Sequence, residues 1–513
     1  MARVLFINPR VREEDVPRHV PYGIALLASI VMEKGHSVQI YDENAWRKSD
    51  SVLKQVLKAD DWDVIALGGI TTAYGSIKKI VEIARNVSPN SKIVLGGGVL
   101  TSLPQEIMFW LYQVDIGVIG EAFNTFPEIL EMIDRGGNEF WEIPGTTVTD
   151  KDGHIRISPI RELIEDLDVL PYPAWDLFPL EEIYFPNSQV LYSEEGMLAK
   201  RRLDINASYG CSLICRYCYH LGISGDMRYE DSSSNNGNEK KVVFDEPGNY
   251  TRNIRYHSPE YVTDMAKYMY DKYKIDFIGF LDENLMTMDK FSGRTWMKGI
   301  CEGFHEKGLA PKYGKDGNRM SGVHWSGTSH ATLHTPEILK TMRKAGCSHL
   351  VYGYESFSPH VMKTIGKGAT PKTNIRSFFN TLEAGIRPIP NQIIGFPNED
   401  FESIYQNMEA WKTLGIVVKP FFATPYPGSE WFTVYREQIV EQYDGNLEEF
   451  VLSLGDATSI TAIISHNFNA VELLGLREMM VNEDLRGIKQ FEKTWRKNHN
   501  IADEQSSTIF SKL

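Results

Sequence analysis

The sequence predicts an α/β protein of several parts, and three observations support this. Over residues 1–140, short apolar runs alternate with helical patterns, as in a doubly wound, Rossmann-like parallel sheet. Over residues 201–428, apolar runs recur that end in polar residues. Over residues 429–513 the pattern is helical and charged. Because 513 residues exceed one ordinary core, we expect three separate domains with these bounds and a linker at 141–200.

The first domain is predicted from a regular alternation of strand and helix patterns. Its first helix begins near Tyr22, shows apolar periodicity and ends at Gly35, a residue that commonly follows helices. A series of this kind builds a parallel sheet that binds ligands at the carboxyl ends of its strands. The expected strands are 3–8, 37–41, 64–69, 92–96 and 116–120, and the expected helices are 22–34, 77–86 and 126–133.

The loops after these strands are rich in glycine and small polar residues. Glycine lacks a side chain, so the backbone can approach a large, flat or phosphorylated ligand closely. Many doubly wound domains turn in this way without binding one, and the dinucleotide fingerprint GxGxxG is absent from this stretch. The candidate ligand-binding residues at the strand ends are Asn8, Thr71, Thr72, Gly96, Gly97, Gly98, Gly120 and Glu121.

The linker is predicted from a hairpin turn at 150–153 and from the proline-broken run 170–175. After the linker, polar residues at the carboxyl ends of several apolar runs are expected to contact a ligand. The polar stretch 222–258 is expected as an insertion, either a lid over the site or a disordered segment. The expected strands of this second domain are 203–207, 275–284, 350–356, 390–397 and 420–428.

Helices are expected next to and beyond this insertion. One begins with Ser258 as its amino cap and Pro259 at its first position. In the C-terminal region, 470–481 and 485–496 are predicted as helices. Four aromatic residues there are expected in the core rather than against a cofactor. They are Trp431, Phe432, Tyr435 and Tyr443.

Three of the five cysteines fall within eight residues, at Cys211, Cys215 and Cys218. Three thiolates on one short loop can hold three irons of a [4Fe–4S] cube and leave the fourth iron open to a substrate or cofactor. A tetrahedral zinc site is the alternative, and it requires a fourth ligand, which His220 can supply. The loop is therefore predicted to bind a metal, with a cluster favoured over zinc.

Composition argues against several other classes of function. The net charge of −14 argues against nucleic acid as the main partner, because nonspecific affinity for nucleic acid requires a basic surface. No apolar run approaches the roughly 20 residues that span a bilayer, and the amino terminus is predicted as a buried strand and not a signal peptide. Isolated Cys301 and Cys347 are expected as buried thiols rather than a disulfide. We therefore expect a cytoplasmic protein that binds neither nucleic acid nor membrane.

The spacing CxxxCxxC, with the aromatic Tyr217 before the last cysteine, resembles the radical S-adenosylmethionine (SAM) superfamily. The resemblance implies a partial TIM-like (β/α) barrel whose three cysteines hold a catalytic [4Fe–4S] cluster that binds SAM. Tyr217 is then expected beside the adenine, or as a packed aromatic. Glu355 and Ser356 are expected to contact SAM, since a carboxylate accepts hydrogen bonds from its amino group or ribose; a solvated strand-end acid is the alternative. Asp282 and Glu283 are candidates for lining the substrate cavity.

Segments 21–28, 33–38, 94–98 and 118–122 resemble, in that order, the cobalamin-binding domain that precedes many radical SAM modules. This resemblance implies that the strand-end residues named above contact cobalamin. Other cobalamin proteins donate a histidine to cobalt from a DxHxxG motif, and this motif does not occur here. The cobalt is therefore expected to lack a histidine as its lower ligand.

Together the two resemblances imply a cobalamin-dependent radical SAM C-methyltransferase. In that chemistry a 5′-deoxyadenosyl radical abstracts hydrogen from an unactivated carbon, for which we favour an sp³ carbon, and methylcobalamin supplies the methyl group. The expected partners are a peptide, protein or small-molecule substrate and an electron donor such as ferredoxin or flavodoxin. The alternatives are a cobalamin-dependent radical SAM cyclase or ring-rearranging enzyme without net methyl transfer, and a non-enzymatic, metal-stabilised binding protein. A methylthiotransferase would need three further cysteines near the amino terminus, and residues 1–200 contain none.

Overall fold

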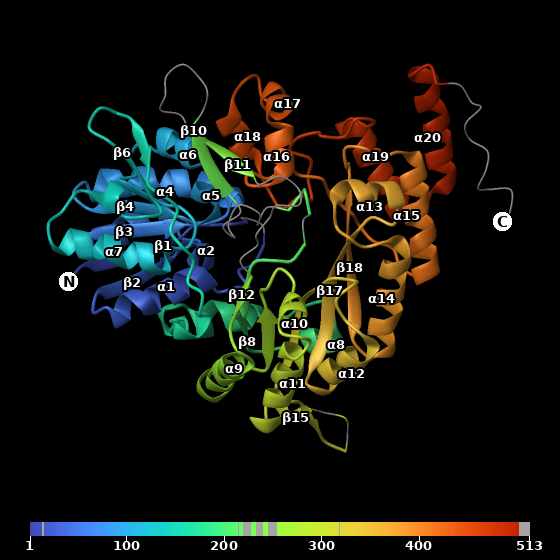
Figure 1. Cartoon of the computed structure of the whole chain (residues 1–513), viewed down its shortest axis with the longest axis horizontal. Helices are drawn as coiled ribbons and strands as arrows, with labels where there is room; N and C mark the ends of the chain where they lie inside the picture. The colour runs from blue at the N-terminus through green and yellow to red at the C-terminus, as the bar shows by residue number, and fades with distance from the viewer. Residues whose placement is uncertain are drawn as a thin grey trace.

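Two large sheets, each covered by helices, form most of the protein (Figure 1). The computed structural model describes residues 1–12, 15–213, 215–218, 227–231, 240–244, 254–315, 317 and 319–501. The first sheet lies at the blue, N-terminal side of Figure 1, and the second sheet is formed by the green to orange segments. The predicted α/β class, with a doubly wound domain followed by a partial barrel, is confirmed.

The first sheet has seven strands in the order β2-β1-β3-β4-β5-β6-β7. β1 to β5 are parallel, whereas β6 and β7 form an antiparallel hairpin at the edge. The strands are β1 Arg3–Asn8, β2 Ser37–Asp42, β3 Val64–Gly68, β4 Lys92–Gly96, β5 Ile116–Val118, β6 Thr146–Thr149 and β7 Ile155–Ile157. The helices are α1 Tyr22–Glu33, α2 Glu43–Trp46, α3 Asp50–Leu57, α4 Tyr74–Val87, α5 Gly97–Ser102, α6 Pro104–Trp110 and α7 Ala122–Asp134, with a 3-10 turn, η1, at Thr71–Ala73.

Side chains of this sheet alternate between two apolar layers. In β1, Val4 and Phe6 pack into one layer, and Leu5 and Ile7 into the other. Because both faces are buried under helices, the strands have nearly continuous apolar sequences. β2 and β3 lie on opposite sides of β1, so the strand order reverses at this point, which is where ligands bind in such sheets.

The sheet differs from the sequence prediction mainly at its edge. The predicted turn at 150–153 joins β6 to β7, and Gly153 has the positive φ of +83° that favours glycine. Because these two strands extend the sheet to Ile157, the structured first domain continues past residue 140. Helix α4 begins at Tyr74, earlier than the predicted residue 77.

The second sheet has six parallel strands in the order β19-β18-β17-β16-β13-β8. Its two outer strands do not pair with each other, so it forms an open, partial barrel. The central strand β16 has no counterpart in the sequence prediction, because its Ser-Gly-Thr-Ser end lacks an apolar run. The strands are β8 Arg202–Ile205, β13 Phe277–Phe280, β16 His324–Ser329, β17 Cys347–Glu355, β18 Arg387–Ile394 and β19 Phe421–Phe422.

Helices cover the outside of this sheet (Figure 1). Helix α9 begins as predicted: Pro259 is its first residue, and Ser258 Oγ accepts a hydrogen bond from the Tyr261 N–H at 3.1 Å. The helices are α9 Pro259–Tyr273, α11 Trp296–Glu306, α12 Pro336–Lys344, α13 Pro359–Ile365, α14 Pro371–Glu383 and α15 Phe401–Leu414. Shorter elements are α8 Glu194–Met197, α10 Thr287–Phe291, β9 Ser208–Tyr209, β10 Met227–Asp231, β11 Lys240–Phe244, β12 Arg255–Tyr256, β14 Lys312–Tyr313 and β15 Arg319–Ser321.

The C-terminal region divides into two groups of helices that pack in different places. Helix α20 packs through Phe491 and Trp495 against Phe401 of α15, outside the barrel. Helices α16 to α18 instead pack on the first domain, where Phe450 shares a core cluster with Tyr74. The bounds are α16 Glu430–Val434, α17 Arg436–Glu441, α18 Leu447–Ser453, α19 Ala470–Val481 and α20 Leu485–Asn498. The predicted helices 470–481 and 485–496 are thus both present.

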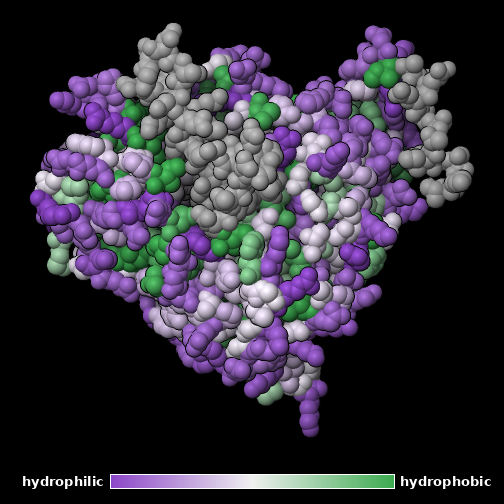
Figure 2. Space-filling view, in the orientation of Figure 1, coloured by the Kyte–Doolittle hydropathy of each residue, from purple (hydrophilic) through white to green (hydrophobic). Residues whose placement is uncertain are grey.

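The surface agrees with this arrangement. The visible face is mostly hydrophilic, and hydrophobic residues gather on it chiefly toward the left half of Figure 2, over the first domain and its border. Within the described parts of the chain, none of the helices has both the length and the apolar character that crossing a bilayer demands.

Candidate active site

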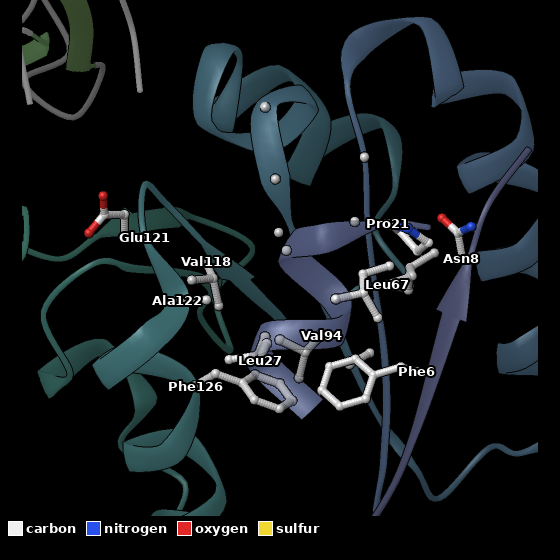
Figure 3. A pocket seen from close by; sticks show the side chains of 18 of the residues that line it. Phe6, Asn8, Pro21, Leu27, Leu67, Val94, Val118, Glu121, Ala122 and Phe126 are labelled. Carbon is white, nitrogen blue, oxygen red and sulfur yellow. The ribbon is translucent and has the colours of Figure 1, made fainter. Parts of the chain in front are cut away.

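The first of two large cavities lies at the carboxyl ends of β1, β3, β4 and β5, and we call it the glycine cavity. It has a volume of about 480 Å³, which is within the usual range for cofactor sites. Figure 3 shows Phe6, Leu27, Val94 and Phe126 gathered together at one side of it. Apolar side chains therefore form one wall, as expected for a site that holds a large and partly apolar ligand.

Backbone forms much of the rest of the glycine cavity. Gly97 has a φ of +81°, and a Cβ atom placed on it would lie 2.7 Å from the backbone nitrogen of Gly69. At Gly120 the φ is +73°, and a Cβ there would meet no atom within 4 Å. Glycine at position 97 thus allows two loops to touch, whereas position 120 faces open space. The predicted residues Gly96, Gly97, Gly98 and Gly120 all line this cavity.

The two predicted polar residues of the glycine cavity lie on opposite sides of it (Figure 3). Asn8 donates a hydrogen bond through Nδ2 to Asp42 at 2.7 Å. Glu121 accepts a hydrogen bond at 3.0 Å from Arg255 of β12, and this ion pair connects the first domain to the second. No histidine occurs among the described residues that line the cavity, in agreement with the absent DxHxxG motif.

The second cavity lies between the cysteine loop, the carboxyl ends of the barrel strands and the first domain, and we call it the cysteine cavity. Its volume is about 610 Å³. Tyr217 and Cys218 of the cysteine motif line it, and so does Glu355 from the end of a separate strand. The lining also includes Arg12, Thr71, Thr72, Glu283, Asn391, Phe396, Phe421, Phe422, Tyr426 and Asp456.

The predicted cobalamin contacts Thr71 and Thr72 therefore face the cysteine cavity and not the glycine cavity. The reason is the η1 turn at Thr71–Ala73, which directs the chain away from the end of β3 toward the barrel. Ile70, the residue just before this turn, lines both cavities and is 42% exposed. The two cavities thus meet at one side chain.

The three cysteines lie on a loop that follows β8 and β9. Cys211 and Cys215 are buried, and Cys218 is partly exposed toward the cavity. Burial raises the pKa of the Cys215 thiol to about 12, so a thiolate at this position requires a bound cation. Within the described parts of the chain, no three metal-ligating side chains are spaced to hold one metal ion.

These residues fit a [4Fe–4S] cluster with one open iron. The donor set is three soft sulfur ligands on one short loop. The last of them, Cys218, lines a cavity large enough for a cofactor. The zinc alternative rests on His220, which lies outside the described residues. Most of the predicted insertion at 222–258 lies outside them as well.

Glu355 is held in an unusual conformation at the end of β17. Pairing with β18 shifts register between Gly353 and Glu355, and Glu355 has a φ of +61°. Such a bulge redirects a side chain and is common beside active sites. Glu355 Oε1 accepts hydrogen bonds from the Tyr217 hydroxyl at 2.8 Å and from Lys367 Nζ at 2.6 Å. The sequence analysis did not identify Lys367. The only signal for it in the sequence is its position between two glycines, Gly366 and Gly368.

Two other predicted residues are buried and hydrogen-bonded to neighbouring protein groups. Ser356 is fully buried, and its hydroxyl donates to Asn407 at 3.2 Å and accepts from the Ser358 N–H at 3.0 Å. Its side chain therefore caps the loop after β17 and does not reach the cavity, because the φ reversal at Glu355 sends consecutive side chains apart.

Asp282 also has a structural position, whereas its neighbour Glu283 lines the cysteine cavity as expected. The Asp282 carboxylate accepts hydrogen bonds from the Ser208 hydroxyl and from the Ala207 N–H, just before the cysteine loop. Burial raises the pKa of Asp282 to about 7. Asp282 thus anchors the strand that leads to the cysteines.

Neighbouring residues of helix α16 pack against the barrel and against the first domain. Trp431 packs against Tyr217 and Phe396, with ring centroids 6.0 Å and 5.4 Å away, and its N–H donates to the Arg216 carbonyl. The next residue, Phe432, stacks on Phe450 in the core of the first domain. Both aromatic residues belong to the core, as the sequence indicated.

Two family models match the chain, in the order of its two sheets. The B12 binding domain matches residues 12–130, and the radical SAM superfamily matches residues 205–410. The glycine cavity falls in the first match and the three cysteines fall in the second. The chain therefore belongs to the cobalamin-dependent radical SAM enzymes, whose cofactors are cobalamin, a [4Fe–4S] cluster and SAM.

Two relatives of this chain differ in the activity that their names state. An uncharacterised methyltransferase of Pyrococcus horikoshii is 27% identical over 410 residues, which cover 80% of this chain and 77% of the relative. The anaerobic magnesium-protoporphyrin IX monomethyl ester cyclase of Rubrivivax gelatinosus is 23% identical over 464 residues, covering 88% and 72%.

A solved structure gives the same fold. The radical SAM methyltransferase TsrM of Kitasatospora setae, with cobalamin and a [4Fe–4S] cluster bound, matches with a TM-score of 0.63 at 15% identity, covering 86% of this chain and 76% of that one. Because the two family models together define a class of enzymes, the non-enzymatic alternative is set aside.

Proposed function

We propose that this enzyme transfers a methyl group to an sp³ carbon of a small molecule bound in the cysteine cavity. The observation that carries the proposal is the meeting of the two cavities at Ile70. A methyl donor in the glycine cavity and an acceptor in the cysteine cavity would lie on either side of this residue. Methyl transfer requires that short separation, because reacting atoms must come within about 3–3.5 Å.

The residues around the cysteine cavity would bind the cluster and SAM. When bound, the cluster supplies the electron that cleaves SAM, and cobalamin supplies the methyl group. Cys211, Cys215 and Cys218 would hold three irons. Glu355 Oε1 is engaged by Tyr217 and Lys367, which would leave Oε2 to accept a hydrogen bond from the amino group or ribose of SAM.

The remaining lining of the cysteine cavity favours an acceptor that is largely apolar. Phe421, Phe422 and Tyr426 supply an aromatic wall, which excludes water from a radical intermediate. Arg12 and Asp456 stand 4.0 Å apart and add one charge of each sign. Because part of the 610 Å³ must hold SAM, the space left suits a small molecule better than a protein segment. TsrM itself has been solved with tryptophan as its substrate.

The test is an anaerobic incubation of the reconstituted enzyme with SAM, cobalamin, a reductant and candidate acceptors. Mass spectrometry should find a methylated product together with 5′-deoxyadenosine and S-adenosylhomocysteine in equal amounts. An acceptor deuterated at the reacting carbon should pass deuterium into 5′-deoxyadenosine. Unlabelled 5′-deoxyadenosine would contradict an sp³ target, and Cys215→Ala serves as the inactive control.

The same experiment separates methyl transfer from the second candidate, a cyclase or ring-rearranging enzyme. Similarity to the Rubrivivax gelatinosus cyclase favours that candidate. It would form 5′-deoxyadenosine and a product of changed ring structure, without a stoichiometric yield of S-adenosylhomocysteine. Product mass therefore decides between the two.

A further inference from the structure

Lys367 is a buried cation that neither the motif pattern nor the proposed methyl transfer requires. It lies in the loop after α13, between Gly366 and Gly368, and is only 7% exposed. The two glycines have φ values of +69° and +70°, so the loop turns tightly enough to direct the lysine inward. Lysine is almost never buried to this degree unless it is paired.

The partners of Lys367 belong to the SAM-binding side of the cysteine cavity. Its Nζ donates to Glu355 Oε1 at 2.6 Å and to the Tyr217 hydroxyl at 3.0 Å. The chain keeps space for this pair: a Cβ on Gly353 would lie 2.2 Å from Glu355 Oε1 and 2.5 Å from Lys367 Nζ. Any residue other than glycine at position 353 would thus displace one of the two charges.

The backbone also fixes Lys367 next to the cysteine loop. The N–H of Arg216, the residue after Cys215, donates to the carbonyl of Ile365 at 3.1 Å. Lys367 Nζ also lies 5.7 Å from the centre of the Tyr217 ring, and Tyr217 stands between Cys215 and Cys218 in the sequence. These contacts place a buried, paired cation beside the cysteine loop.

We propose that Lys367 raises the reduction potential of the cluster by placing a buried positive charge beside the cysteine loop. Reduction adds one electron to the cluster, and a nearby cation stabilises the reduced form more than the oxidised form. Glu355 has the opposite effect and also keeps the lysine charged in an apolar setting. The pair would thereby set how readily the cluster delivers its electron, in addition to orienting Glu355.

The experiment is a redox titration of the reconstituted cluster, followed by electron paramagnetic resonance without SAM, cobalamin or acceptor. Lys367→Met should lower the midpoint potential, whereas Glu355→Gln should raise it. Lys367→Arg keeps the charge and should stay near the wild-type value. Lys272→Met, on the outer helix α9, is the matched control that removes an exposed lysine and should produce no shift.

Opposite shifts in the two partner variants are the signature of an electrostatic effect. A role of the pair in packing alone would shift both variants in the same direction or neither, and either result would overturn the proposal. Should Lys367→Met fail to assemble a cluster, as judged by iron and sulfide content, Glu355→Gln decides: an unchanged or lower potential contradicts the proposal. Because no acceptor is present, the outcome is independent of whether the proposed methyl transfer is correct.

Discussion

The glycine cavity and the cysteine cavity are similar in size but are lined by different kinds of groups. The first, of about 480 Å³, is made of backbone and apolar side chains, and its polar residues Asn8 and Glu121 are engaged with protein partners. The second, of about 610 Å³, carries ionisable groups, among them Glu283, Glu355 and Cys218. The first cavity is thus suited to recognise a ligand by its shape, whereas the second combines charged groups with an aromatic wall.

This difference matches what each cavity is required to do. A cofactor that stays bound throughout turnover needs a rigid surface that fits it, which close-packed backbone supplies. A site where electrons and charges move needs preset charges, because these stabilise the changing species without rearranging. Changes in one cavity should therefore leave the cofactor of the other cavity in place.

The largest effect is expected from Cys218→Ala, which removes one cluster ligand from the cysteine cavity. With two thiolates left, the loop should lose the cluster, and reductive cleavage of SAM should fall below detection. Cobalamin should still bind, since the glycine cavity is unchanged. Iron and sulfide analysis, 5′-deoxyadenosine assays and the cobalamin absorption spectrum check this; simultaneous loss of cobalamin would break the comparison.

The next effect is expected from Gly97→Ala in the glycine cavity. The added Cβ would lie 2.7 Å from the Gly69 nitrogen at a φ of +81°, so the two loops must move apart. We expect cobalamin affinity to fall at least tenfold while cluster content and SAM cleavage remain. Gly136→Ala is the matched control: its φ is +70° with nothing within 4 Å of the Cβ, so it should cost only the left-handed strain of about 1–2 kcal/mol.

A smaller and more selective effect is expected from the neighbouring aromatic residues of α16. Trp431→Ala should change the electron paramagnetic resonance spectrum of the cluster, because Trp431 packs on Tyr217. Phe432→Ala should weaken cobalamin binding, because Phe432 belongs to the first domain's core. Each substitution should lower the free energy of unfolding by about 3–5 kcal/mol. Loss of the same cofactor in both variants would show that α16 does not separate the two regions.

The most gradual effect is a pH dependence of stability that originates in the barrel. Burial raises the pKa of Asp282 to about 7 and that of Glu399 to about 8. The unfolded chain loses these protons first, so stability should fall from about pH 4 up to these values, by at most about 1.4 kcal/mol per pH unit for each acid. Urea unfolding at pH 5, 6 and 7 measures the slope, and Asp282→Asn should flatten it. An unchanged slope would assign the dependence to other groups.

Much of this architecture was predictable because local pattern and fold agree. Apolar runs gave β1 to β5, the Ser258 and Pro259 pair gave the start of α9, and cysteine spacing gave the cluster loop. Strand β16 was not predictable in this way, because its carboxyl end is polar while its neighbours on both sides supply the apolar contacts. The position of β16 in the sheet therefore depends on its pairing with β13 and β17 more than on an apolar sequence of its own.

The site was predictable at the level of loops but less so for single side chains. The glycines of the first domain line their cavity, whereas Thr71 and Thr72 face the other one, because a short turn after β3 reverses the chain. Lys367 could not be found from spacing, since burial, and not sequence neighbours, pairs it with Glu355. Conformations such as the φ of +61° at Glu355 depend on tertiary contacts that no local pattern specifies.

The return of helices α16 to α18 to the first domain has a consequence for biosynthesis. Tyr74 hydrogen-bonds Glu448 across 374 positions of sequence, and Arg436 pairs with Glu106 across 330. During translation, the sheet of β1 to β7 emerges well before the helices that complete its outer layer. The nascent chain thus carries an uncovered apolar surface around Tyr74 and Trp110 until near the end of synthesis, and that interval is when aggregation or chaperone capture would compete with assembly.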